Sequence, residues 1–212
     1  MEVKTLTLGE LGTNCYIVTS AAGNAAVIDP ADDAQRILDT LSAENAELKM
    51  ILLTHGHFDH TGAVADLKEQ TGAKVYIHAK DECMLDDTIK NVAYLCPDYS
   101  YKPFTADVLL SGGDIIRLDE VEFSVMSTPG HTAGSVVFFA DNCMFAGDTM
   151  FEGSAGRTDF YSGDYIAQRN SLARLAALRE DYLIYPGHGG TTTLKQEKQF
   201  NPFLGQSSVD FF

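Results

Sequence analysis

Hydrophobic and polar positions in the first half of the chain switch between the period of a strand and the period of a helix. A helix is predicted from residue 34, because apolar side chains recur there at i, i+3, i+4 and i+7 behind a capping aspartate, Asp32 or Asp33. Further helical segments are predicted after Ala63 and from Lys80. The short apolar runs that predict strands in this half lie at 3–8, 15–19, 25–28, 49–53 and 74–77.

The second half of the chain repeats this alternation after a long loop. Residues 88–106 lack a hydrophobic period and carry aromatic side chains beside prolines, so we predict a loop there. A helix is predicted at 164–179. The apolar runs that predict strands lie at 114–117, 121–127, 135–140, 143–146 and 182–185.

Both halves are rich in strands with helices interspersed, and no linker separates them. Such a pattern favours two sheets packed face to face with helices on the outside. A chain of 212 residues is also long enough to bury a substantial core. We therefore predict an α+β fold, a four-layer αββα sandwich, formed by one domain over residues 1–212.

The segment THGHFDH at 54–60 directly follows the apolar run at 49–53. It places His55, His57, Asp59 and His60 within six positions, and a loop leaving a strand end can curl these side chains around one point. Imidazole nitrogen and carboxylate oxygen are ligands that suit zinc and its neighbours among the transition metals. The segment therefore predicts a metal-binding loop.

Three later positions extend this candidate site. His131 in TPGHTAGS, Asp148 in FAGDT and His188 in YPGHGG each follow an apolar or β-branched run and lie beside glycine. A single zinc ion normally takes three or four protein ligands, whereas these segments together offer seven. We therefore expect two divalent metal ions, with zinc favoured and iron or manganese as alternatives.

These motifs resemble those of the metallo-β-lactamase-fold hydrolases. The resemblance extends from LGTNCYIV at 11–18 through VIDP at 27–30 to EKQFNPFL at 197–204. Within that superfamily the chain is most similar to the short glyoxalase II-like proteins, the hydroxyacylglutathione hydrolase-like group. The segments that carry this narrower match are GRTD at 156–159, PGHG at 186–189 and NPFL at 201–204.

The resemblance implies a role for each candidate ligand. One metal would be held by His55, His57 and His131, the other by Asp59, His60 and His188, with Asp148 as the bridge. Hydroxide between the two metals would attack the carbonyl of a small-molecule thioester such as S-lactoylglutathione, and Asp59 would also act as the catalytic base. The implied enzyme is a metal-dependent thioester hydrolase.

Other members of the superfamily leave alternatives open. The iron-dependent persulfide dioxygenases carry a stretch similar to GRTDF at 156–160, but they have PAHD where this chain has PGHG. Some β-lactamases have cysteine where this chain has Asp148, and the aspartate favours a binuclear hydrolytic site. Lactamase activity, nuclease activity and a non-catalytic, metal-bound binding subunit are the remaining alternatives.

The composition limits the kinds of binding partner and the cellular location that we expect. A formal charge of −15 argues against nucleic acid as a partner, because phosphate contacts draw on clustered lysine and arginine. The four cysteines show no C-x-x-C spacing, which favours a reducing, cytoplasmic location. No signal peptide and no membrane-spanning segment are expected from the pattern, and the oligomeric state is left open.

Four further features allow two interpretations each. Cys15 lies in a predicted strand, so we favour packing over a nucleophilic role. Arg157 either pairs with Asp159 or reaches a substrate carboxylate, and we favour the internal pair. The aromatic loop at 94–104 either lines the substrate entrance or covers the core. The terminal segment 209–212 packs either against the body of the protein or against a partner subunit.

Overall fold

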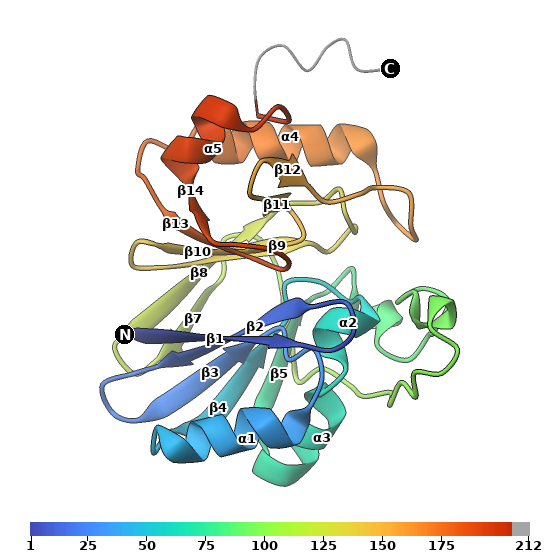
Figure 1. The fold of residues 1–212 in the computed structure, drawn as a ribbon, viewed down its shortest axis with the longest axis vertical. Helices are drawn as coiled ribbons and strands as arrows, with labels where there is room; N and C mark the ends of the chain where they lie inside the picture. The colour runs from blue at the N-terminus through green and yellow to red at the C-terminus, as the bar shows by residue number, and fades with distance from the viewer. Residues whose placement is uncertain (205–212) are drawn as a thin grey trace.

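A computed structural model describes residues 1–204 of the chain. Two six-stranded sheets pack face to face, and helices cover the outer face of each sheet (Figure 1). The predicted α+β fold, a four-layer αββα sandwich, is confirmed. The segment 209–212, whose packing is left open above, lies outside the described residues.

The first sheet combines an antiparallel edge with a parallel remainder. Its strands are β1 (Glu2–Leu8), β2 (Thr13–Thr19), β3 (Asn24–Ile28), β4 (Glu47–Leu52), β5 (Lys74–His78) and β6 (Val108–Leu110). They lie side by side in this order, antiparallel from β1 to β3 and parallel from β3 to β6. Parallel neighbours need crossover connections, and helices supply two of them.

The second sheet is largely antiparallel. Its strands are β7 (Ile115–Leu118), β8 (Val121–Ser127), β9 (Val136–Ala140), β10 (Cys143–Gly147), β13 (Leu183–Pro186) and β14 (Thr192–Thr193). They lie in the order β14-β13-β10-β9-β8-β7, and β10 and β13 run parallel. The short strands β11 (Met150–Phe151) and β12 (Ser154–Ala155) form a separate pair.

The helices lie on the two outer faces (Figure 1). The first sheet is covered by α1 (Ala34–Ala43) and α3 (Val64–Thr71), the second by α4 (Tyr165–Ala176) and α5 (Leu194–Phe200), and α2 (Phe58–Thr61) is a single turn. Helix α1 begins as predicted, because the side chain of Asp33 accepts a hydrogen bond from the backbone N–H of Arg36 at 3.1 Å. Ile37 and Leu41 of this helix are buried.

Successive side chains along the strands separate the hydrophobic core into layers. In β2, Cys15 and Ile17 point into the core beneath α1 and α3, whereas Tyr16 and Val18 point between the two sheets. A third core lies between the second sheet and helices α4 and α5. The middle core contains residues from both halves of the chain. This supports the prediction of one domain, whose extent over residues 1–212 stays a prediction.

One predicted element is wrong and several were not foreseen. The helix predicted from Lys80 is a single 3₁₀ turn, η1 (Glu82–Met84). The segment packs against the 54–60 loop so closely that a Cβ atom on Gly56 would lie 2.9 Å from Cβ of Met84. Contacts with that loop, and not a helical period, therefore determine its path. The elements absent from the sequence prediction are β6, β11, β12, β14, α2, α5 and a second 3₁₀ turn, η2 (Ala93–Leu95).

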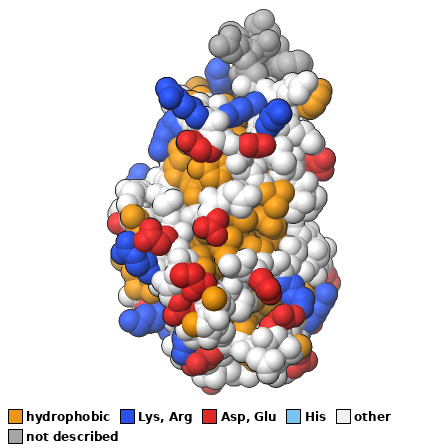
Figure 2. All heavy atoms as spheres, turned by 90° about the vertical axis from the view of Figure 1, so that its left-hand side faces the viewer, with side chains coloured by type: hydrophobic (Ala, Val, Ile, Leu, Met, Phe, Trp, Pro, Cys, Tyr) orange, Lys and Arg blue, Asp and Glu red, His pale blue; other side chains and the backbone are white. Residues whose placement is uncertain are grey.

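Figure 2 shows how charged side chains are distributed on one face of the molecule. On the face shown in Figure 2, the described lysines and arginines lie in small separate groups among acidic and hydrophobic side chains. Within residues 1–204, no helix has the length and apolar character that a bilayer-spanning segment needs.

Candidate metal centre

Neighbouring strand ends bring polar residues to one edge of the sandwich. Asp29, the 54–60 loop and Asp81 follow the parallel strands β3, β4 and β5. Because the carboxyl ends of parallel strands meet at the same edge, this is where ligands bind in many α/β proteins. The second sheet contributes His131 from the β8–β9 connection, Asp148 after β10 and His188 after β13.

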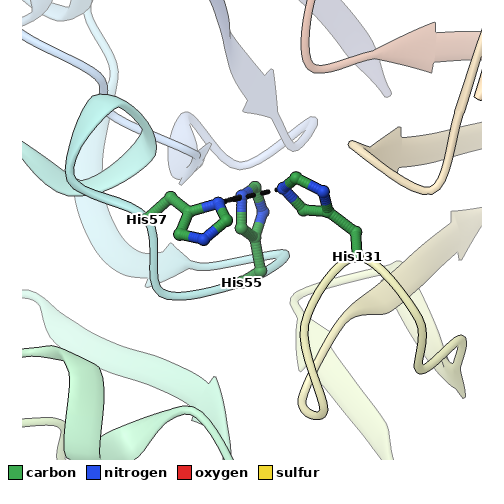
Figure 3. Close-up of side chains that lie close together, drawn as sticks. All are labelled: His55, His57 and His131. Carbon is green, nitrogen blue, oxygen red and sulfur yellow. Dashed lines mark hydrogen bonds between the residues drawn. The ribbon is translucent and has the colours of Figure 1, made fainter. Parts of the chain in front are cut away.

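His55, His57 and His131 point their rings toward one another (Figure 3). Nε2 of His55 lies 3.1 Å from Nδ1 of His57, and Nε2 of His131 lies 2.9 Å from the same Nδ1 atom. Two nitrogens bound to one tetrahedral zinc at about 2.0–2.1 Å would lie roughly 3.3 Å apart. The three buried nitrogens therefore form a trio of the size that one metal ion requires.

Asp59, His60 and His188 form a second trio beside the first. Oδ2 of Asp59 lies 3.6 Å from Nε2 of His60 and 3.3 Å from Nε2 of His188. Asp148 reaches both trios, with Oδ1 3.2 Å from Nε2 of His60 and Oδ2 3.6 Å from Nε2 of His131. The structure thus brings all seven predicted ligands together, and their binding of metal stays a prediction.

A buried carboxylate behind the site sets the tautomers of two histidines. Oδ2 of Asp29 accepts hydrogen bonds from Nδ1 of His60 at 3.0 Å and from Oγ1 of Thr54 at 2.6 Å. Because Thr54 donates its proton to Asp29, its oxygen accepts from Nδ1 of His55 at 3.1 Å. A proton on Nδ1 leaves Nε2 of both rings with a free lone pair, which is the form that binds a metal.

The backbone at Arg157 has the same effect on His131. Its carbonyl oxygen accepts a hydrogen bond from Nδ1 of His131 at 2.7 Å, so Nε2 is again the free nitrogen. The Arg157 guanidinium donates to both oxygens of Asp159, at 2.6 and 2.7 Å, and stacks on Phe160. The favoured ion pair between Arg157 and Asp159 is confirmed. This segment contributes to the site through the backbone carbonyl of Arg157, which orients His131.

The charges of the site favour a cation in the second trio. Burial and the neighbouring imidazoles lower the pKa of His57 to about 3, and they lower the pKa of His55 well below its usual value. Burial also lowers the pKa of His60, but the carboxylates of Asp148 and Asp59 outweigh it and raise that pKa well above its usual value. Two carboxylates around one imidazole therefore attract either a proton or a metal ion.

Two buried polar atoms indicate that metal ions would fit this site. Nε2 of His60 and Oδ1 of Asp148 lie 3.2 Å apart, and neither atom has a hydrogen-bond partner among the described residues. Buried polar atoms without a partner are costly, and a divalent ion would satisfy both. The nitrogen and oxygen donors suit zinc, iron or manganese, so the residues fit two divalent ions.

Strand β2 holds the His188 loop in place through two side chains. Nδ2 of Asn14 donates to the carbonyl of Pro186 at 3.1 Å, and the Tyr16 hydroxyl donates to the same oxygen at 2.5 Å. A Cβ atom on Gly187 would lie 2.1 Å from Oδ1 of Asp148, so only glycine fits between the two ligand loops. In the motif PGHG, Gly187 is therefore required for steric reasons, and His188 is the candidate metal ligand.

Sequence reasoning missed Asp29 and Asp81 as parts of the site. The Asp81 carboxylate accepts hydrogen bonds from the backbone N–H groups of Gly56 and Gly134 at 3.1 and 2.7 Å, and from Oγ1 of Thr132 at 2.6 Å. It thereby joins the 54–60 loop to the His131 loop. The sequence signal was limited to the place of each carboxylate shortly after a predicted strand, and the structure shows that these strands, β3 and β5, flank β4.

A cavity of about 370 Å³ opens beside the second trio and has Asp59 in its wall. Residues 95–99 of the aromatic loop line this cavity, and the ring of Tyr99 packs on Phe58 at 5.2 Å. Phe104 of the same loop packs against the first core. One part of the 94–104 loop therefore lines a cavity and another part covers the core, and the role of the cavity as a substrate entrance stays a prediction.

Comparison with known proteins places the chain in a family. The metallo-beta-lactamase superfamily model matches residues 8–188. Hydroxyacylglutathione hydrolase GloC of Haemophilus influenzae is 34% identical over an alignment that covers 98% of this chain and 100% of its own length. The structure of BLEG-1 B3 metallo-beta-lactamase is 34% identical and has a TM-score of 0.91, with 96% of this chain and 99% of its own covered. TTHA1623, solved in a di-iron-bound form, is 36% identical with a TM-score of 0.86, over 95% and 100% of the two chains. The chain therefore belongs to the metallo-beta-lactamase superfamily and is a metal-dependent hydrolase.

Proposed function

We propose that this protein hydrolyses acyl thioesters with two divalent metal ions held by His55, His57, Asp59, His60, His131, Asp148 and His188. The observation that carries the proposal is the pair of adjacent ligand trios joined by Asp148, with a cavity opening onto Asp59. The similarity to a hydroxyacylglutathione hydrolase supports thioesters as the substrate class. Zinc is the proposed metal, and the di-iron form of TTHA1623 keeps iron as the alternative.

Two such ions, held by the seven candidate ligands, would supply a water molecule of lowered pKa and would polarise a substrate carbonyl. Asp59 then has the role of orienting the water and accepting its proton as it attacks. Its carboxylate is suited to this role because Oδ2 accepts a hydrogen bond from Oγ1 of Thr13 at 3.1 Å and faces His188 at 3.3 Å. The carboxylate is held from two sides, and its side chain remains 14% exposed toward the cavity.

The leaving group explains why thioesters suit this set of residues. A thiol ionises near pH 8.5, so a thiolate departs without a proton from the enzyme. An amine or alkoxide leaving group needs a proton donor. Apart from the seven candidate ligands, the described residues that line the cavity include no histidine or lysine that could supply one.

A thioesterase assay tests the proposal. Purified protein loaded with zinc is mixed with S-lactoylglutathione and a panel of simpler acyl thioesters, and the released thiol is measured with a chromogenic reagent. We expect hydrolysis that a chelator abolishes and added zinc restores. If zinc-loaded protein cleaves no member of the panel, the proposal is wrong.

Hydrolysis of β-lactams is a second candidate activity. It is favoured by the similarity to BLEG-1, a B3 metallo-beta-lactamase, at a TM-score of 0.91 and 34% identity. A chromogenic β-lactam measured beside the thioester panel separates the two activities. The larger kcat/KM identifies the chemistry for which the site is better suited.

A further inference from the structure

The cavity beside Asp59 carries acidic side chains and no basic ones. Among the residues that line it, Glu10, Asp32 and Asp98 have carboxylates, and none is lysine or arginine. Glu10 and Asp98 are exposed, and Asp32 is half-buried. We call these three carboxylates the rim at the mouth of the cavity. A substrate group that enters this space therefore meets negative charge before it reaches the ligand trios.

These carboxylates are not neutralised by neighbouring cations. Within residues 1–204, no lysine or arginine forms an ion pair with Glu10, Asp32 or Asp98. Lys102, on the same aromatic loop as Asp98, pairs with Asp66 and Glu69 at 2.8 and 2.9 Å. The negative charge at the mouth is therefore available to act on a substrate.

Apart from Thr13 and Asp59, the rest of the wall is mostly apolar. Phe58 and Tyr99 form an aromatic pair with ring centres 5.2 Å apart, and Leu8 is buried beside them. Leu11 and Leu95 also line the cavity and remain 53% and 51% exposed, so their side chains can contact a ligand there. Hydrocarbon groups of a ligand can pack against this wall, and the carboxylates of the rim favour a positive or neutral group beside them.

We infer that the cavity selects thioesters whose thiol part is apolar and neutral or positively charged, and that it disfavours thiol parts bearing carboxylates, such as glutathione. The inference rests on the proposed thioesterase function and narrows its substrate class. Like charges repel, and a carboxylate at the cavity mouth would lie among Glu10, Asp32 and Asp98 without a cation to pair with. The ligand trios attract the carbonyl, whereas the rim acts on the opposite end of the substrate.

Lactoyl thioesters that differ in the charge of their thiol part test this selectivity. The three probes are the esters of thiocholine, which is cationic, N-acetylcysteamine, which is neutral, and 3-mercaptopropionate, which is anionic, with S-lactoylglutathione for comparison. The informative quantity is the ratio of kcat/KM for the cationic ester to that for the anionic one. Variants Glu10→Gln and Asp98→Asn remove rim charge, while Glu2→Gln removes an exposed carboxylate at the far end of β1.

We expect the ratio to fall about two- to fivefold with each rim variant, the range for exposed ion pairs, and mainly through KM. The ratio should also fall as salt rises, because exposed charges are screened. Glu2→Gln should leave it unchanged. Comparing variants cancels the different intrinsic reactivities of the esters. A ratio that neither rim variant moves, or a preference for the glutathione ester that both leave intact, overturns the inference.

Binding of uncleavable analogues separates this inference from the proposed function. Thioether versions of the three probes cannot be hydrolysed, and their dissociation constants are measured by calorimetry on the zinc-loaded protein. If no thioester is cleaved but the cationic thioether binds more tightly and loses that advantage in Glu10→Gln, the thioesterase function is wrong and the selectivity of the cavity stands. If the three thioethers bind alike, the selectivity is wrong.

Discussion

Replacing Asp29 with asparagine should weaken the proposed metal site of Asp59, His60 and His188 directly, and the site of His55, His57 and His131 less strongly through Thr54. In the native protein Oδ1 of Asp29 accepts the backbone N–H of Thr54 at 2.8 Å, and Oδ2 accepts protons from Thr54 Oγ1 and His60 Nδ1. An asparagine that keeps the bond to the backbone turns its NH₂ group toward His60. The imidazole must then accept at Nδ1 and carry its proton on Nε2, the nitrogen that faces Asp59 and Asp148.

The size of the effect follows from this reversal. Loss of the outer hydrogen-bond partner of a metal-binding histidine typically costs about 10- to 100-fold in metal affinity. That loss corresponds to about 1.4–2.8 kcal/mol. If the amide instead flips to keep His60 satisfied, its NH₂ group opposes the N–H of Thr54, and a buried unpaired donor costs about 1–3 kcal/mol of stability.

Zinc titration against a chromogenic chelator measures the outcome. For Asp29→Asn we expect the trio of Asp59, His60 and His188 to lose the most affinity and the histidine trio to lose less, because His55 is linked to Asp29 only through Thr54. Asp39→Asn is the control, since this exposed carboxylate on α1 lies away from the site and, within residues 1–204, accepts a side-chain hydrogen bond from Gln35 alone. Two native affinities together with native stability in Asp29→Asn would refute the reasoning.

Three further substitutions probe the supports of the site and the core. Asp81→Ala leaves the buried N–H groups of Gly56 and Gly134 without an acceptor, while Oγ1 of Thr132 can still donate to Oγ of Ser135, so we expect the free energy of unfolding to fall by about 2–5 kcal/mol in urea titrations; a change below about 1 kcal/mol contradicts this. Gly187→Ala places a methyl group 2.1 Å from Oδ1 of Asp148, so the purified variant should contain no zinc. The control Gly189→Asn, at a position with open space and φ of +79°, should retain zinc. Equal zinc contents in the two variants would rule out the steric argument. Phe138→Ala, in the middle core, should cost about 3–5 kcal/mol in thermal or urea unfolding without changing zinc stoichiometry.

Strands buried on both faces explain how much of the fold could be predicted. The run Cys15-Tyr16-Ile17-Val18 reads as one apolar segment because alternate side chains enter different cores. The run predicts a strand, but it does not tell which side chain faces which layer. The four layers followed from the alternation of such runs with helical stripes, and the two-residue strands β11, β12 and β14 are too short to leave a pattern.

Helix α5 was missed because polar contacts hold it. Its buried side chains are Leu194 and Glu197, so it has no apolar stripe. Glu197 accepts hydrogen bonds from Oγ1 of Thr192 at 2.6 Å and from Nδ2 of Asn201 at 2.8 Å. Asn201, in the motif NPFL, also donates to the carbonyl of Ser154 at 2.9 Å. A sequence pattern marks such residues as polar without telling that they are buried.

The candidate ligands were easier to find than the residues that orient them. Five of the six histidines lie in glycine-flanked segments after apolar runs, and that density pointed to a metal site. Asp29 and Asp81 are single carboxylates in ordinary settings, and their role depends on strand order. Sequence alone does not show that β3, β4 and β5 are neighbours.

The most direct test of the account is anomalous X-ray scattering from crystals of zinc-loaded protein grown without chelators. The account predicts two zinc peaks about 3.5–4 Å apart. One should lie within bonding distance of His55, His57 and His131, and the other within bonding distance of Asp59, His60 and His188, with Asp148 between them. A single peak, or peaks that these side chains do not contact, would contradict the central claim.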